Sequence, residues 1–193
     1  MGSYISVGLV YLDTIVNEDV LFLIKELQCV CDMIAVSYPK DDLYERWEEK
    51  TFQGMNGFVD AFMLLDAKKM SSGKMYCKIK DNNYNVLVKI REENDKCKGF
   101  LFEIPEEELL RNGCTTKNLE KVTNEIAKNI IQLWNKMRFS YAFCDSEADI
   151  ESTLYQFDED ENPKYSLLLL KDKQAQPVIK LSSWCIDGIT PRK

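Results

Sequence analysis

The chain has 193 residues, of which 45% are hydrophobic and 11% aromatic, so it has the material for a sizeable core, which argues against global disorder. Its formal net charge is −7, which disfavours direct binding to DNA or RNA and favours a basic protein as partner. Histidine is absent, and with it the commonest general base and the commonest metal ligand.

The first third of the chain predicts strands alternating with helices. Residues 4–11 are rich in β-branched and aromatic side chains and predict a buried strand. Asn17, followed by two acidic residues, predicts a capped helix start. Residues 33–38 predict a strand that ends at Pro39. The charged residues 41–50, whose few apolar members have helical spacing, predict a short helix or a loop. The apolar residues 58–70 predict a helix.

The middle of the chain predicts three strands followed by a long helix. Residues 74–80, 84–90 and 99–104 are separated by turn-forming residues, which is typical of a meander. A helix over residues 116–138, capped by Thr115 or Thr116, is the best-defined element. Its apolar positions recur every three or four residues, at Leu119, Val122, Ile126, Ile130 and Leu133.

The last part of the chain predicts short strands and loops. Residues 140–144 predict a strand, and residues 145–151 predict a loop that enters a turn of helix. Residues 164–170 and 177–184 predict a hairpin, and residues 186–193 a frayed tail. Strands in runs with interspersed helices favour a single α+β domain over residues 1–193. We expect a mixed or mainly antiparallel sheet packed by two to four helices.

The chemistry-bearing residues predict no catalytic, metal or cofactor site. The seven cysteines are scattered, and the one close pair, Cys29 and Cys31, lacks the spacing of a zinc or redox motif. We expect free thiols packed as small hydrophobic groups in a reducing cytoplasm. No phosphate-binding loop occurs, and the apolar stretches are too short to span a membrane.

Three stretches of sequence together resemble a known family. They are residues 1–8 (MGSYISVG), residues 133–136 (LWNK) at the end of the long helix, and residues 141–151 (YAFCDSEADIE). The chain is similar here to the bacterial immunity proteins of polymorphic-toxin systems, and to the Immunity protein 64 family in particular. The resemblance implies a non-catalytic cytoplasmic protein that binds and neutralises a cognate toxin encoded beside it, and it supplies no site residues.

Exposed carboxylates near aromatic side chains are the candidates for partner contact, since an acidic surface suits a toxin with a basic cleft. The segment 145–149 follows a short strand, where loops often carry function, although Asp145 or Ser146 capping a helix is the alternative interpretation. The acidic run 158–161 lacks the glycine of a calcium loop and predicts a solvated loop. The predicted partner-binding residues are Asp145, Glu147, Asp149, Tyr155, Asp158, Glu159, Asp160 and Glu161.

Two other functions fit the same sequence. A small-molecule-binding domain or a carboxylate-based enzyme would have a pocket over the sheet, and the enzyme would place two acids facing each other in it. A structural homo-oligomer would expose a contiguous apolar patch.

Overall fold

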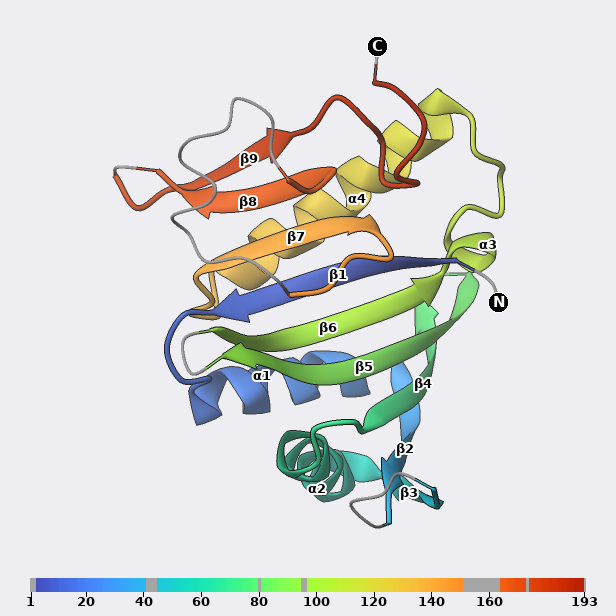
Figure 1. The fold of residues 1–193 in the computed structure, drawn as a ribbon, viewed down its shortest axis with the longest axis vertical. Helices are drawn as coiled ribbons and strands as arrows, with labels where there is room; N and C mark the ends of the chain where they lie inside the picture. The colour runs from blue at the N-terminus through green and yellow to red at the C-terminus, as the bar shows by residue number, and fades with distance from the viewer. Residues whose placement is uncertain are drawn as a thin grey trace.

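The structure is a computed structural model, and it describes residues 3–40, 45–79, 81–94, 97–150, 164–172 and 174–192. Over these residues the chain forms one nine-stranded sheet in the order β3-β2-β4-β5-β6-β1-β7-β8-β9, and every strand pairing in it is antiparallel (Figure 1). The strands are β1 (Tyr4–Tyr11), β2 (Cys31–Pro39), β3 (Trp47–Gln53), β4 (Ser72–Ile79), β5 (Asn82–Asn94), β6 (Cys97–Pro105), β7 (Tyr141–Ser146), β8 (Leu167–Lys171) and β9 (Pro177–Leu181). The predicted α+β class is confirmed.

Three helices pack on one face of this sheet. They are α1 (Asn17–Gln28), α2 (Gly54–Ala67) and α4 (Thr116–Trp134), while the short α3 (Glu106–Leu109) follows β6 (Figure 1). Side chains from all three meet the sheet in one core cluster, to which Leu23, Phe62 and Ile130 contribute. The predicted cap of the long helix is confirmed, because the Thr115 hydroxyl accepts a hydrogen bond from the Asn118 N–H. That helix ends four residues earlier than expected.

A second core cluster covers the opposite face around β1, β7 and β8. Because successive side chains of a strand point to opposite faces, Leu9 packs toward the helices and Val10 toward this second cluster. The Phe143 ring stacks on the Tyr165 ring with 4.1 Å between centroids. The central strands are therefore buried on both sides, as the apolar sequence of residues 4–11 predicts.

Two predictions about the first third of the chain are wrong. The segment expected as a short helix or loop contributes the edge strand β3, which pairs with β2 along its whole length and buries Phe52. Pairing to a neighbouring strand outweighed the helical spacing of its apolar residues. Asn17 does not cap α1, because the cap position is Val16 and no side chain bonds there. The acidic residue that is buried at the start of this helix is Asp19.

The expected frayed tail is also wrong over residues 186–192. Cys185 and Ile186 are fully buried, and Trp184 forms a β-bridge with Pro191. The Arg192 guanidinium donates hydrogen bonds to the carbonyl oxygens of Trp184 and Ser166. The chain end therefore folds back onto the sheet through buried apolar groups and charge-assisted hydrogen bonds, neither of which shows in the local sequence.

The expectation of seven free thiols is wrong for one pair. Cys31 on β2 and Cys77 on β4 are directly opposite in the sheet register and form a disulfide. Cys29, which the sequence suggests is a core residue, is exposed instead. Residues 46 positions apart in sequence become neighbours only through strand pairing, so this bond was not readable from cysteine spacing.

Candidate functional site

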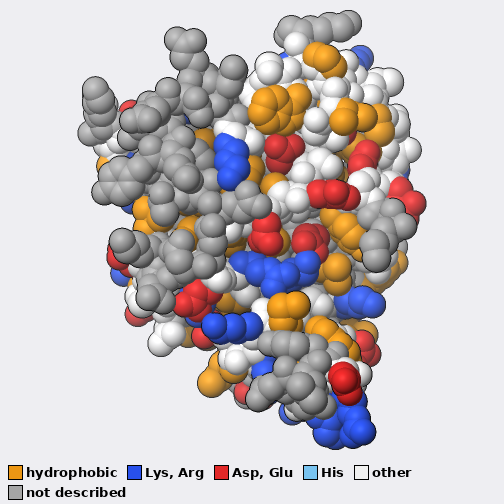
Figure 2. Space-filling view, in the orientation of Figure 1, with side chains coloured by type: hydrophobic (Ala, Val, Ile, Leu, Met, Phe, Trp, Pro, Cys, Tyr) orange, Lys and Arg blue, Asp and Glu red, His pale blue; other side chains and the backbone are white. Residues whose placement is uncertain are grey.

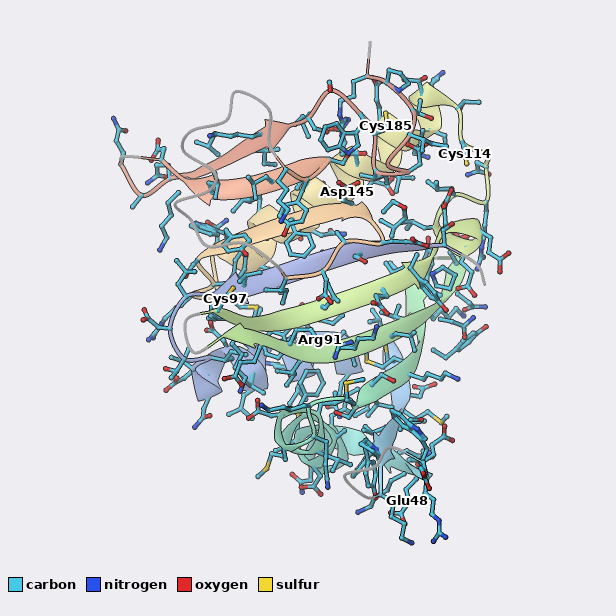
Figure 3. The ribbon with its side chains drawn as sticks, in the orientation of Figure 1. Glu48, Arg91, Cys97, Cys114, Asp145 and Cys185 are labelled. Atoms are coloured by element: carbon cyan, nitrogen blue, oxygen red, sulfur yellow. A yellow bond between two sulfur atoms is a disulfide. The ribbon has the colours of Figure 1, made fainter. Side chains whose placement is uncertain are left out.

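Asp145 is an internal structural group. It lies near the end of β7, with 8% of its surface exposed. Its carboxylate accepts hydrogen bonds from the N–H groups of Ser146 and Ser166 at 2.8 and 2.9 Å and from the Trp184 indole at 3.2 Å. Figure 3 shows Asp145 between β7 and the C-terminal segment. It therefore ties three parts of the chain together and has little surface left for a partner.

Burial raises the pKa of the Asp145 carboxyl, although its hydrogen bonds and the nearby Arg192 guanidinium oppose that shift. Arg192 also donates to the Ser166 hydroxyl at 2.9 Å. The alternative interpretation, in which Asp145 or Ser146 caps a helix, is wrong, because residues 145–150 form no helix. We assign Asp145 the role of anchoring the C-terminal segment.

Glu147 and Asp149 are exposed carboxylates on a well-anchored loop. Glu147 has a left-handed backbone with φ of 49°, and its N–H donates to the Tyr4 carbonyl at 2.9 Å. The next turn is fixed by buried Ile150 and by the Tyr165 hydroxyl, which donates to the Asp149 carbonyl. Both side chains thus project from a rigid base, whereas the other predicted residues, Tyr155 and 158–161, lie outside the described residues.

An open hollow of about 420 Å³ lies beside Glu147, at the end of the sheet where β1 begins. The hollow is lined by Tyr4, whose carbonyl oxygen accepts the Glu147 N–H, together with Glu106, Glu107 and Cys114. Glu106 accepts a hydrogen bond from the Ser3 hydroxyl. Burial, together with the negative charges of Glu106 and Asp187, raises the pKa of the Cys114 thiol. We refer to Glu106, Glu107 and Glu147 as the acidic end.

The face of the sheet away from the helices carries charges of both signs. Figure 2 shows basic and acidic side chains interspersed over the visible part of this face. Lys89 and Glu103, from adjacent strands, form a half-buried ion pair at 2.6 Å. Arg91, which points to the same face of the sheet as Lys89, donates a hydrogen bond to the Lys69 carbonyl oxygen (Figure 3). A mixed surface of this kind gives no continuous basic track for a nucleic-acid backbone.

An apolar groove of about 380 Å³ lies between α1 and α4, over the sheet. We call it the α1–α4 groove. Its floor comes from β1, β4, β5 and β6 and its walls from the two helices. Its lining includes Val7, Phe22, Leu27, Phe102, Ile104 and Ile126. These six side chains are only partly buried. This groove was not readable from the sequence, because the apolar stripe of residues 116–138 is the same whether it faces a filled core or an open groove.

Over the described residues, the hollow at the start of β1 and the α1–α4 groove contain no facing pair of acids. Glu26 is the one carboxylate among the residues lining the α1–α4 groove. Glu106 and Glu107 are consecutive on α3, so their side chains project about 100° apart. Within the described ranges there is also no cluster of cysteine and carboxylate side chains able to hold a metal. In this part of the chain, neither hollow thus has the pair of facing acids that the carboxylate-enzyme alternative requires.

Comparison with known proteins gives a family and nothing closer. No helix among the described residues is both long and apolar enough to cross a membrane. Neither the curated proteins nor the solved structures include a match to this chain. The family model described as Immunity protein 64 matches residues 1–192, essentially the whole chain, and confirms the resemblance noted in the sequence. The chain therefore belongs to the Immunity protein 64 family, and its general function is immunity.

Proposed function

We propose that the chain acts as a non-catalytic immunity protein that binds one cognate toxin domain and blocks its activity in the bacterial cytoplasm. The observation that carries this proposal is the match of the whole chain to an immunity family. Immunity proteins are generally non-catalytic, and this family property is the ground for proposing binding without catalysis.

The acidic end and the neighbouring Asp149 support binding to a basic toxin surface. Glu107, Glu147 and Asp149 are exposed, and the last two sit on a backbone fixed by hydrogen bonds to Tyr4 and Tyr165. Because this backbone is already ordered, binding avoids the entropy cost of ordering the loop, and the exposed carboxylates steer a basic partner during diffusion. The segment 158–161 remains a proposed contact on sequence grounds alone.

Association kinetics with the toxin domain encoded beside this chain test the proposal. The double substitution Glu147→Lys and Asp149→Lys should slow association about tenfold at low ionic strength, because it reverses two steering charges. The matched control is Asp13→Lys. Asp13 is exposed and follows the other end of β1, far from the acidic end, so its reversal should change the rate much less.

The outcomes separate the function from the proposed surface. A toxin domain that fails to bind the unmodified chain at micromolar concentration would contradict the function itself. Equal association rates for the double variant and the control would leave the function standing and remove Glu147 and Asp149 from the interface. Charge reversal of residues 158–161 in the same assay tests that segment separately.

A further inference from the structure

We propose that the α1–α4 groove receives an amphipathic helix of the toxin, whose apolar side enters the groove and whose basic residues meet the acidic end. This inference rests on the proposed function and adds the place and chemistry of a second contact. Soluble proteins rarely leave so many apolar side chains partly exposed in one concave surface unless something covers it.

The groove is closed at one end. The ammonium group of Lys136, just beyond α4, lies 5.3 Å from the centre of the Phe22 ring on α1. The Asp19 carboxylate on α1 accepts a hydrogen bond of 2.7 Å from the Arg138 N–H. The start of α1 is thus tied to the segment after α4, which fixes both helices at this end.

The two helices diverge from that closed end. Figure 1 shows α1 and α4 converging toward the left of the view and separating toward the right, with β1 and β6 between them. Phe102 and Ile104 on β6 are consequently only partly buried, although they point to the helix side of the sheet. Ile79, at the end of β4, is 44% exposed at the open side. No element from the described part of the chain covers the sheet here.

The open side of the groove adjoins the acidic end. Ile104 lines the groove, and Glu106 and Glu107 follow it in the chain after a single proline. Glu108 accepts a hydrogen bond of 2.6 Å from the main-chain N–H of Asn85, the residue before groove-lining Val86. An apolar occupant that leaves the groove on this side meets carboxylates, so basic residues at that end of the occupant are favoured.

A helix fits the groove better than an extended strand does. The floor strands β1, β4, β5 and β6 are interior strands, paired on both sides, so they offer no free edge for a further strand. Binding must therefore come from side chains, and a helix presents its apolar residues on one side at spacings of three and four. A small molecule would remain more exposed in this open groove than in a typical enclosed pocket.

A matched pair of substitutions tests the groove. Ile79→Arg places a charge in the groove, and Leu181→Arg places the same charge on β9, at a site of nearly equal exposure (44% and 46%) that does not line the groove. Kd for the neighbouring toxin domain is measured for both purified full-length variants, with circular dichroism as a check on folding. We expect Ile79→Arg to weaken binding at least about tenfold and Leu181→Arg to leave it nearly unchanged.

Photocrosslinking identifies what occupies the groove. With para-benzoylphenylalanine in place of the partly buried Leu27, ultraviolet light should attach a toxin peptide with helical apolar spacing and flanking Lys or Arg. Normal binding of Ile79→Arg to a toxin that binds the unmodified chain would overturn the inference alone. Failure of the unmodified chain to bind would overturn the proposed function as well. Two other results would identify a different occupant and would also overturn the inference about the groove. One is a dimer that forms without toxin and dissociates on Ile79→Arg substitution; the other is a copurifying apolar compound that this substitution releases.

Discussion

The carboxylate of Asp19 accepts a hydrogen bond from the main-chain N–H of Arg138, 119 positions away, and another from the Tyr11 hydroxyl. Asp19 is 2% exposed, and burial together with this carboxylate raises the pKa of Tyr11. One buried acid thus joins β1, α1 and the segment after α4, and it holds the closed end of the α1–α4 groove.

Replacing Asp19 by alanine should lower the free energy of unfolding by about 3 kcal/mol, because the buried Tyr11 hydroxyl and the part-buried Arg138 N–H lose their acceptor. Urea denaturation followed by circular dichroism measures this loss. The control is Glu18→Ala at the adjacent exposed position, which should change stability by less than about 0.5 kcal/mol. Equal effects of the two substitutions would show that Asp19 does not make this connection.

Gly8 lies against the Phe143 ring in the middle of the sheet. A Cβ atom at Gly8 would be 2.2 Å from that ring, which is itself stacked on Tyr165. Gly8→Ala should therefore destabilise the protein by about 2 kcal/mol or more. Gly57→Ala, on α2, meets no contact closer than 3.4 Å and should stabilise the helix by about 0.5–1 kcal/mol. Thermal melts of both variants measure these two effects. A stabilising effect of Gly8→Ala would contradict the close packing of Gly8 against Phe143.

The disulfide between Cys31 and Cys77 predicts five free thiols in the oxidised, denatured chain. Its reduction should lower the free energy of unfolding by about 2–4 kcal/mol, because the reduced unfolded chain gains conformational freedom. A thiol assay in denaturant, with and without prior reduction, gives the count. Seven thiols without reduction would show that the bond does not form. The Cys31→Ser and Cys77→Ser double variant should match the reduced protein in stability.

The raised pKa of Asp145 predicts a pH effect of definite sign. Because burial favours the protonated form, the folded state binds this proton more tightly than the unfolded state does. The contribution of Asp145 to stability is therefore fully present below its unfolded pKa and is lost as pH rises through the folded value. The stability difference between the unmodified chain and Asp145→Asn should accordingly fall as pH rises above about 4.

Urea denaturation from pH 3.5 to pH 7 measures that difference. Ser182→Ala is the control, since the Ser182 hydroxyl donates to the Trp184 carbonyl in the same cluster but does not titrate. Its stability difference from the unmodified chain should not change with pH in this range. A stability difference for Asp145→Asn that stays flat or rises with pH would contradict the assignment of Asp145 as a buried carboxyl whose pKa is raised by desolvation.

Local patterns predicted the elements whose side chains follow one clear period. The strand over residues 4–11 and the cap at Thr115 are where the sequence places them, because β-branched runs and threonine caps act through near neighbours. The edge strand β3 was missed, since Trp47 and its neighbours also fit a helical spacing and only pairing with β2 decides between the two.

The candidate site was less readable from sequence than the fold. Asp145 was expected at the surface because it follows an apolar strand, but Ser166 and Trp184, from the far end of the chain, enclose it. The α1–α4 groove depends on the angle between two helices, which no local pattern encodes. Glu147 and Asp149 are exposed as expected, and their contact with a partner stays a prediction.

The most direct test of the central claim is the binding of the toxin domain encoded beside this chain to the full-length protein, measured by biolayer interferometry at low and high salt. A cognate immunity complex should have a Kd of about 10 nM or tighter, with association that slows as salt screens the carboxylates. No binding at micromolar concentration, at either salt level, would contradict a toxin-binding function.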